Sequence, residues 1–90
     1  MARKLTVYGW TSLRRECPAA PNGSHQTREI VAAHSKAEAA RCYGTRIDWN
    51  YGCATGNDVE VALALSSPLT VFWRPLDERG ATAWRKATPQ

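Results

Sequence analysis

The sequence predicts an α+β domain in which a three-stranded, mostly antiparallel sheet carries two helices on one face, in the order β-β-α-α-β. Two observations predict this fold: three segments are rich in β-branched and aromatic residues, and two others begin with helix-capping residues. The chain has 90 residues, 43% of them hydrophobic, which is enough for one core but not for two. We therefore expect a single domain over residues 1–76 and a polar tail over residues 77–90.

The first two strands are predicted on either side of a long loop. Residues 5–10 (LTVYGW) alternate between two sets of side chains, as in a strand. Residues 16–24 contain two prolines and an Asn-Gly pair, which are typical of a loop. Residues 27–33 (TREIVAA) form the second strand, so that the two strands make a hairpin with a long tip.

The clearest local signal is a capping box at Ser35 and Glu38. In this motif the serine hydroxyl accepts from the backbone of Glu38, whose carboxylate reaches back to the backbone of Ser35. Good helix formers follow, and Gly44 can end the helix in the left-handed conformation. The spacing predicts a helix over residues 36–43, with His34 packed against its first turn.

Residues 45–56 show no sustained period and are expected to form an irregular connection. The next segment, residues 58–66, is compatible with two structures. Its aliphatic residues alternate with smaller or polar ones, as in a strand: Val59, Val61, Leu63 and Leu65. Against a strand, Asn57 or Asp58 is a good N-cap and Ser66-Ser67-Pro68 a plausible stop. We favour a helix that is buried on most sides, because its apolar residues surround it.

A third strand is predicted over residues 69–74 (LTVFWR). Pro75 cannot donate a backbone hydrogen bond, so this end should lie at an edge or just past the last pairing. In the polar tail, Trp84 is expected to fold back onto the sheet.

The expected core combines strand and helix side chains, and the other face of the sheet should carry aromatic residues and arginines. The core candidates are Val7, Ile30 or Val31, Ala37, Ala40, Leu63, Leu65, and Val71 or Phe72.

Positive charge is concentrated in the first half of the chain. Residues 1–46 hold eight basic and three acidic residues, whereas residues 47–90 hold four and five. Nine of the twelve basic residues are arginines, which suit phosphate recognition. Contact with nucleic acid is therefore one hypothesis, with Tyr8 or Trp10 available for stacking. A solvated basic face crossed by ion pairs is the simpler interpretation. The phosphate-contact candidates are Arg14, Arg15, Lys36 and Arg41.

Enzymatic and metal-binding functions find little support. Cys42 and His34 could form a nucleophilic pair across one helix, but no motif supplies an orienting residue or an oxyanion site. A zinc site from Cys42, Cys53 and His34 would lack the paired ligand spacing of structural zinc sites. We expect no catalytic residue, no cofactor and no metal.

The sequence also lacks membrane and export signals. No run of about 18 apolar residues is present, as a membrane-spanning helix would require. The N-terminal segment has no signal-peptide core. Three cysteines without a C-x-x-C pair fit neither a disulfide scaffold nor a zinc ribbon, and we expect a cytoplasmic protein.

The residue types that dominate protein interfaces are abundant: four Trp, three Tyr and nine Arg. A sheet covered on one side only would leave a face or an edge for a partner, and small domains often gain missing core by forming homodimers. A second interpretation is that the tryptophans fill the core. The protein-contact candidates are Trp10, Arg28, Trp73, Arg74 and Trp84.

Three segments, residues 6–10, 26–41 and 55–76, resemble parts of small accessory proteins encoded by actinobacteriophages. Together they cover about half of the chain. The resemblance lies in the pattern of strand, capped helix and strand, and it transfers no catalytic residue. It implies expression in the cytoplasm of a bacterial host and a binding role. We therefore expect a non-enzymatic accessory protein that binds a host protein, a phage protein or itself, with nucleic acid as the alternative partner.

Overall fold

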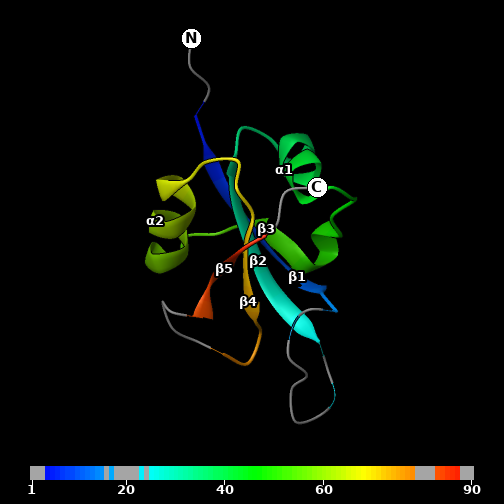
Figure 1. Ribbon diagram of the computed structural model, residues 1–90. Coiled ribbons are helices and arrows are strands. Elements are labelled where there is room, and N and C mark those ends of the chain that lie inside the picture. Colours follow the sequence, from blue (N-terminus) through cyan, green and yellow to red (C-terminus); the bar gives the residue numbers. More distant parts are fainter. Residues whose placement is uncertain (1–3, 16, 18–22, 24, 79–82, 88–90) are drawn as a thin grey trace.

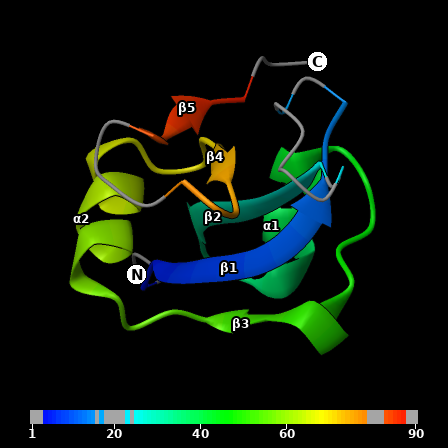
Figure 2. The ribbon, with the colours of Figure 1, turned by 90° about the horizontal axis from the view of Figure 1, so that it is seen from below.

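The computed structural model describes residues 4–15, 17, 23, 25–78 and 83–87, which form a five-stranded antiparallel sheet and two helices (Figure 1). The strand order is β3-β1-β2-β4-β5, as Figure 2 shows from below. The elements are β1 (Thr6–Leu13), β2 (Gln26–Ala33), α1 (Lys36–Tyr43), the 3₁₀ turn η1 (Trp49–Tyr51), β3 (Gly52–Ala54), α2 (Asp58–Ser66), β4 (Phe72–Pro75) and β5 (Arg85–Lys86). The α+β class is confirmed, whereas the predicted count of three strands is wrong.

The sheet is built around β2. The predicted hairpin is present, with Thr6 of β1 opposite Ala33 and Leu13 opposite Gln26. β4 pairs with the other side of β2 and sets Phe72 opposite Ile30. β2 is therefore the central strand. Most of the predicted loop over residues 16–24 lies outside the described residues.

The two helices cover opposite faces of the sheet, as the ribbon shows (Figure 1). One core forms between the sheet and α1, and its buried members are Trp10, Val31, Ala33, Ala39, Ile47 and Val71. The other forms between the sheet and α2, from Val7, Ile30, Ala32, Ala64 and Phe72. The prediction of both helices on one face is therefore corrected, and so is that of an open face with aromatic residues. Residues 30–33 (IVAA) are apolar without interruption, which is typical of a strand buried on both faces.

The core predictions fare better for the strands than for the helices. Val7 is buried, and so are both members of each strand alternative, Ile30 with Val31 and Val71 with Phe72. On the helices, Ala40 and Leu63 pack against the two cores as predicted, whereas Ala37 and Leu65 do not. Ala39 is buried while Ala37 is exposed, and Ala64 is buried while Leu65 is exposed.

α1 confirms the predicted bounds and both caps. The Ser35 side chain accepts from the backbone N–H of Glu38 at 3.1 Å, and Gly44 has a left-handed φ of 91°. The carboxylate of Glu38 reaches one residue further back than predicted. It accepts from the backbone N–H of His34 at 2.8 Å and lies 2.7 Å from His34 Nδ1. These contacts lower the pKa of Glu38, the backbone hydrogen bond from His34 being the main cause.

The strands β3 and β5 are absent from the prediction because three and two residues cannot show a period. β5 pairs with the first half of β4, so Pro75 lies past the last pairing on that side, as expected. β4 begins at Phe72, three residues later than predicted. Trp84 packs on the α2-side core, as expected. Since residues 85–86 belong to the sheet, the ordered fold extends beyond the predicted boundary at residue 76; residues 79–82 and 88–90 lie outside the described part.

A buried ion pair crosses the α1 face of the sheet. Glu29 of β2 is fully buried, and it accepts from Arg14 Nε at 2.8 Å and from Arg14 Nη2 at 2.7 Å. The hydroxyl of Thr27 donates to the same carboxylate at 2.7 Å. The Arg14 guanidinium lies 5.7 Å and 5.3 Å from the ring centroids of Tyr43 and Trp73. Charge, hydrogen bonds and aromatic faces thus compensate the burial of both groups.

Glu29→Leu should strongly destabilise the fold, because it removes the buried carboxylate that accepts hydrogen bonds from Arg14 and Thr27. We expect the free energy of unfolding to fall by about 3–5 kcal/mol, and Arg14→Met in the same chain to recover part of this loss. Urea unfolding followed by tryptophan fluorescence measures both. Glu78→Gln is the control, since it breaks an exposed pair with Arg85 at 3.9 Å and should cost less than about 1 kcal/mol. Equal losses for Glu29→Leu and Glu78→Gln would contradict the structural role of the buried pair.

Candidate functional site

Two of the predicted protein-contact residues lie in the core. Trp10 is 1% exposed and Trp73 is 6% exposed, so neither offers its side chain to a partner in this structure. The Trp10 ring meets Tyr43 and Trp49 edge to face, with centroids 5.1 Å and 6.3 Å apart. Because the chain has only one Phe and one Met, tryptophan side chains fill space in its core.

The other three protein-contact candidates are held by contacts within the chain. Arg74 donates to the backbone carbonyls of Pro75, Leu76 and Glu78 at 3.0–3.1 Å. Its guanidinium also lies 5.2 Å from the ring centroid of Trp84. Arg28 forms an ion pair with Glu60 of α2, 2.9 Å apart. Arg28, Arg74 and Trp84 therefore stabilise the fold.

The four phosphate-contact candidates do not act alike. Arg14 is committed to Glu29, and Lys36 Nζ lies 5.1 Å from the ring centroid of Trp49. Arg15 and Arg41 are exposed. The ion pair with Glu29 thus removes Arg14 from the proposed basic surface.

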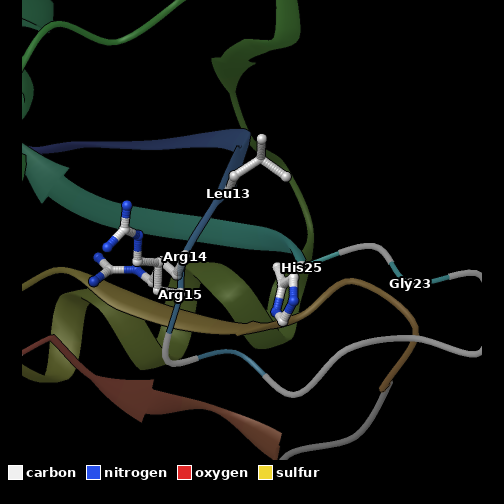
Figure 3. A pocket seen from close by; sticks show the side chains of 5 residues that line it. All are labelled: Leu13, Arg14, Arg15, Gly23 and His25. Carbon is white, nitrogen blue, oxygen red and sulfur yellow. The ribbon is translucent and has the colours of Figure 1, made fainter.

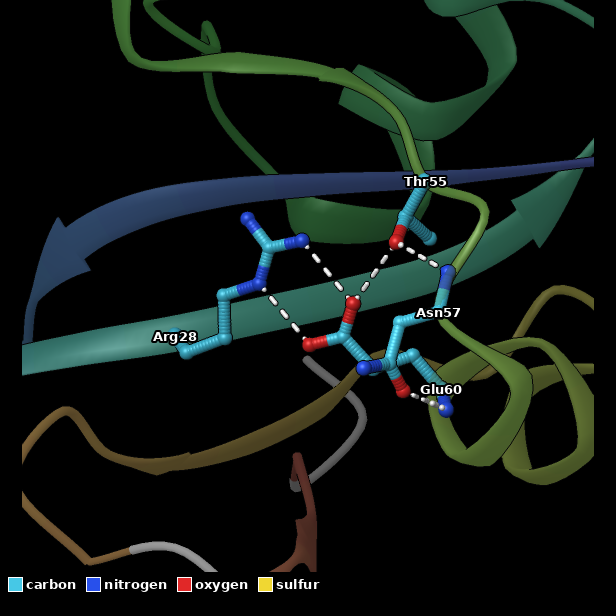
Figure 4. Close-up of polar contacts among 4 residues, drawn as sticks. All are labelled: Arg28, Thr55, Asn57 and Glu60. Carbon is cyan, nitrogen blue, oxygen red and sulfur yellow. Dashed lines mark hydrogen bonds and ion pairs between the residues drawn. The ribbon is translucent and has the colours of Figure 1, made fainter.

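A polar network attaches α2 to the sheet (Figure 4). Arg28 Nε and Nη2 donate to the two carboxylate oxygens of Glu60 at 3.0 Å and 2.9 Å. The Thr55 hydroxyl donates to the same carboxylate at 2.8 Å. Asn57, the N-cap of α2, accepts from the backbone N–H of Glu60 at 3.1 Å. Glu60 is therefore held through its side chain by the sheet and through its backbone by the helix cap.

Gly9 of β1 makes room for this network. A Cβ atom at this position would lie 2.4 Å from Arg28 Nη2 and 2.7 Å from Arg28 Cζ. Such separations are far below van der Waals contact. Glycine thus allows the guanidinium to lie flat against β1 and to reach Glu60.

The network keeps both partners charged. Burial alone would raise the pKa of Glu60, but the hydrogen bonds from Arg28 and Thr55 and the charges of Arg28 and Arg74 outweigh it, so that this pKa is lowered. The hydrogen bond to Glu60 raises the pKa of Arg28 against the opposing effect of burial.

The position of Glu60 determines which side of α2 faces outward. Glu60 and Ala64 are one turn apart and are the buried residues of the helix. At 100° per residue, Val59, Ala62 and Leu65 then fall on the opposite side. Val59 is 56% and Leu65 43% exposed, and Ala62 is exposed as well. We call these three residues the α2 outer face. The expectation that α2 is buried on most sides is wrong, because the burial of Glu60 turns Val59, Ala62 and Leu65 to the solvent, while Val61 and Leu63 pack against the core.

Leu69, in the turn after α2, is a second unusual aliphatic residue. It is 47% exposed, and its backbone has a φ of 65°, a left-handed conformation that costs roughly 1–2 kcal/mol for a residue with a Cβ atom. The turn is held by hydrogen bonds from the backbone N–H of Leu69 to Ala32 and from that of Thr70 to Ser67. An aliphatic side chain is thus exposed on a strained backbone.

Two shallow hollows lie elsewhere on the described surface. One, of about 490 Å³, is at the end of the β1–β2 hairpin and is lined by Leu13, Arg14, Arg15, Gly23 and His25 (Figure 3). Two of its polar groups already have partners, since Arg14 binds Glu29 and His25 Nδ1 lies 2.7 Å from the carbonyl of Cys17. The other, of about 610 Å³, is lined by the consecutive residues 46–50.

Metal ligands do not gather in the part of the chain that the structure describes: it contains no cluster of three or more His, Cys, Asp or Glu side chains. Cys42, Cys53 and His34 thus do not form the zinc site considered from the sequence. The three cysteines are free thiols, and burial, together with the charge of Glu38, raises the pKa of Cys42. Neither described helix is long and apolar enough to cross a membrane.

Comparison with known proteins identifies no relative: no family model matches the sequence, and neither the curated proteins nor the solved structures include a significant match. The candidate site therefore stands on its geometry alone.

The sequence reasoning missed the roles of Glu60 and Glu29 and the exposure of Val59, Leu65 and Leu69. One signal was available for α2. The helix has apolar residues all round and two carboxylates, Asp58 and Glu60, in its first turn, so either carboxylate could face the sheet. Only the position of Arg28 on the facing strand decides between the two.

Gly9→Ala should destabilise the protein through the Arg28–Glu60 pair. The new methyl group collides with the guanidinium, and we expect a loss of about 1–3 kcal/mol in the free energy of unfolding. Gly56→Ala is the matched control, because a Cβ atom there meets nothing within 4 Å. In a chain with Arg28→Ala and Glu60→Ala, the cost of Gly9→Ala should nearly vanish. An unchanged cost in that background would show that the collision does not act through the ion pair.

Glu60 should also make stability depend on pH. Its pKa is lowered in the folded state, so its contribution is complete above the ordinary glutamate value of about 4.3 and is lost as the pH falls through the lower folded value. The stability difference between the wild type and Glu60→Gln should therefore be large at pH 6 and shrink towards pH 3, as measured by urea unfolding. A difference that stays constant or grows on acidification would contradict this assignment.

Proposed function

We propose that this protein is a protein-interaction module that binds a partner through the α2 outer face and the neighbouring Leu69. One observation carries the proposal: α2 buries the carboxylate of Glu60 and exposes Val59 and Leu65, whereas Val61 and Leu63 pack against the core. Exposed aliphatic groups contribute nothing to the stability of the isolated chain, whereas covering them with a partner contributes about 25 cal/mol per Å².

Charge supports a protein partner over a nucleic acid. The three residues of the α2 outer face carry no charge, and at 100° per residue the exposed carboxylate of Asp58 falls on the same side of the helix. A phosphate backbone would find no cation among these residues. Arg14 is paired with Glu29 within the fold, which weakens the nucleic-acid alternative.

The resemblance to actinobacteriophage accessory proteins suggests where this interaction module works. In that setting the chain works in the cytoplasm of a bacterial host, without catalysis, and its partner is a host or phage protein or a second copy.

Leu65→Glu should abolish partner binding while preserving the fold, because this side chain is exposed. The wild type, Leu65→Glu and the control Leu13→Glu serve as baits in an actinobacterial lysate, with and without nuclease. Leu13 is 68% exposed and ends β1, which is not part of the proposed surface. We expect the wild type and Leu13→Glu to retain a protein that Leu65→Glu loses. Equal retention by all three baits, no retention, or retention abolished by nuclease would contradict the proposal.

Leu69→Asn should stabilise the isolated chain and weaken partner binding. Asparagine tolerates the left-handed conformation better than leucine does, so we expect the free energy of unfolding to rise by about 0.5–1 kcal/mol. Urea unfolding measures the gain, and the lysate capture measures the loss of binding. A variant that is more stable and binds as well as the wild type would show that Leu69 is not part of the contact surface.

A further inference from the structure

We propose that this protein has a second contact surface, on the side of α1, that binds single-stranded nucleic acid weakly. The surface consists of exposed cations and aromatic residues of α1 and η1, and we call it the α1 basic surface: Lys36, Arg41, Arg46, Trp49 and Tyr51. It lies across the sheet from the α2 outer face (Figure 1). The inference therefore does not depend on the proposed function.

The first support is positive charge that the fold leaves without a carboxylate partner. Lys36, Arg41 and Arg46 are exposed, and within the described ranges none of the three forms an ion pair. Arg14 differs from them, because Glu29 neutralises it. Three cations are thus available to phosphate groups on this side of the molecule.

Two carboxylates lie in the same segment, and each already accepts from a backbone N–H group. Glu38 accepts from His34 at 2.8 Å, and Asp48 accepts from Asn50 at 3.0 Å. Three cations against two carboxylates leave a small positive excess. We therefore expect few phosphate contacts and a dissociation constant on the order of 10–100 μM at low salt.

The second support is an aromatic ring exposed beside these cations. Tyr51, in η1, is 66% exposed. The Lys36 ammonium of α1 lies 5.1 Å from the ring centroid of Trp49, which also belongs to η1, so α1 and η1 form one surface. A base of a single strand can stack on an exposed aromatic ring such as Tyr51, whereas the bases of a duplex are stacked on one another.

The third support is the hollow of about 610 Å³ in the same segment. It is lined by residues 46–50, so that the Arg46 guanidinium and the Asn50 amide accompany the apolar side chains of Ile47 and Trp49. Its volume lies within the roughly 300–1,000 Å³ of ligand sites. A shallow hollow next to Tyr51 suits one base of an extended strand.

The α1 basic surface keeps two of the phosphate-contact candidates predicted from the sequence, Lys36 and Arg41. It adds Arg46, which the sequence did not single out. Trp10, a predicted stacking residue, is 1% exposed, and Tyr51 takes that role instead.

Fluorescence anisotropy of a labelled strand of about 12 thymidines, titrated with the full chain at about 50–200 mM salt, tests the inference. With three phosphate contacts, the logarithm of the association constant should fall with that of the salt concentration with a slope of about −2. Arg46→Ala should weaken binding and reduce this slope by about 0.7. Lys86→Ala is the matched control, because this exposed cation lies opposite Phe72, on the side of α2, and it should change neither value.

Tyr51 variants test the stacking. Tyr51→Ala should weaken binding roughly tenfold and leave the salt slope unchanged, because it removes a ring and no charge. Tyr51→Phe should bind as the wild type does. A duplex of the same length should bind more weakly than the single strand.

Several results would overturn the inference. They are the absence of binding at about 500 μM protein and 50 mM salt, equal effects of Arg46→Ala and Lys86→Ala, and a Tyr51→Ala variant that binds like the wild type. Polyglutamate that competes as well as unlabelled oligothymidine would show a surface for anions of any kind and would also overturn it.

The two proposals fail separately. Leu65→Glu should bind the single strand as the wild type does, and a loss in this variant would place the nucleic-acid site on α2 instead. Absence of nucleic-acid binding leaves the interaction module standing, because lysate capture after nuclease treatment tests the α2 outer face alone.

Discussion

The bidentate ion pair between Arg28 and Glu60 determines how the two parts of this fold meet. It joins the central strand to α2, and it depends on Gly9 of the neighbouring strand for space. Thr55 and Asn57 complete it from the segment that leads into the helix. A buried carboxylate without its partner is costly, so the helix cannot turn about its axis without a large penalty. The exposure of Val59 and Leu65 is the direct consequence, and the interaction surface is thus a product of the ion pair.

A second ion pair, between Arg14 and Glu29, lies on the opposite face of the sheet. Arg28 and Glu29 are neighbours on β2, so their side chains point to opposite faces, one to Glu60 and the other to Arg14. Shifting the register of β2 by one residue would exchange the faces and break both pairs at once. The two pairs therefore specify the register at one end of β2, whereas the apolar residues 30–33 fill both cores at the other end. The same pairs neutralise two of the arginines that give the N-terminal half its basic character.

The helices and the longer strands could be predicted from the sequence because their signals are local. Ser35 and Asn57 cap helices with the predicted bounds, and the alternation in residues 5–10 identifies the hairpin. The face of the sheet that each helix covers could not be predicted, because the capping residues of a helix do not indicate on which side of the sheet it packs. The short strands β3 and β5 exist only through their pairing with β1 and β4. The candidate site depends on a contact between residues 28 and 60, which are far apart in the sequence, so local patterns do not predict it. The predicted contact residues Trp10 and Trp73 lie in the core instead.

The outward orientation of Val59 and Leu65 on α2 is the central claim, and methyl NMR with a soluble gadolinium chelate tests it most directly on the unmodified chain. The measurement belongs at a concentration well below that of any self-association. The structure predicts strong relaxation enhancement for the methyl groups of Val59 and Leu65, comparable with that of the exposed Leu13, and almost none for Ile30 and Val31. Protection of Val59 and Leu65 to the level of Ile30 in the dilute protein would mean that α2 is rotated, and it would contradict both the role of the Arg28–Glu60 pair and the surface derived from it.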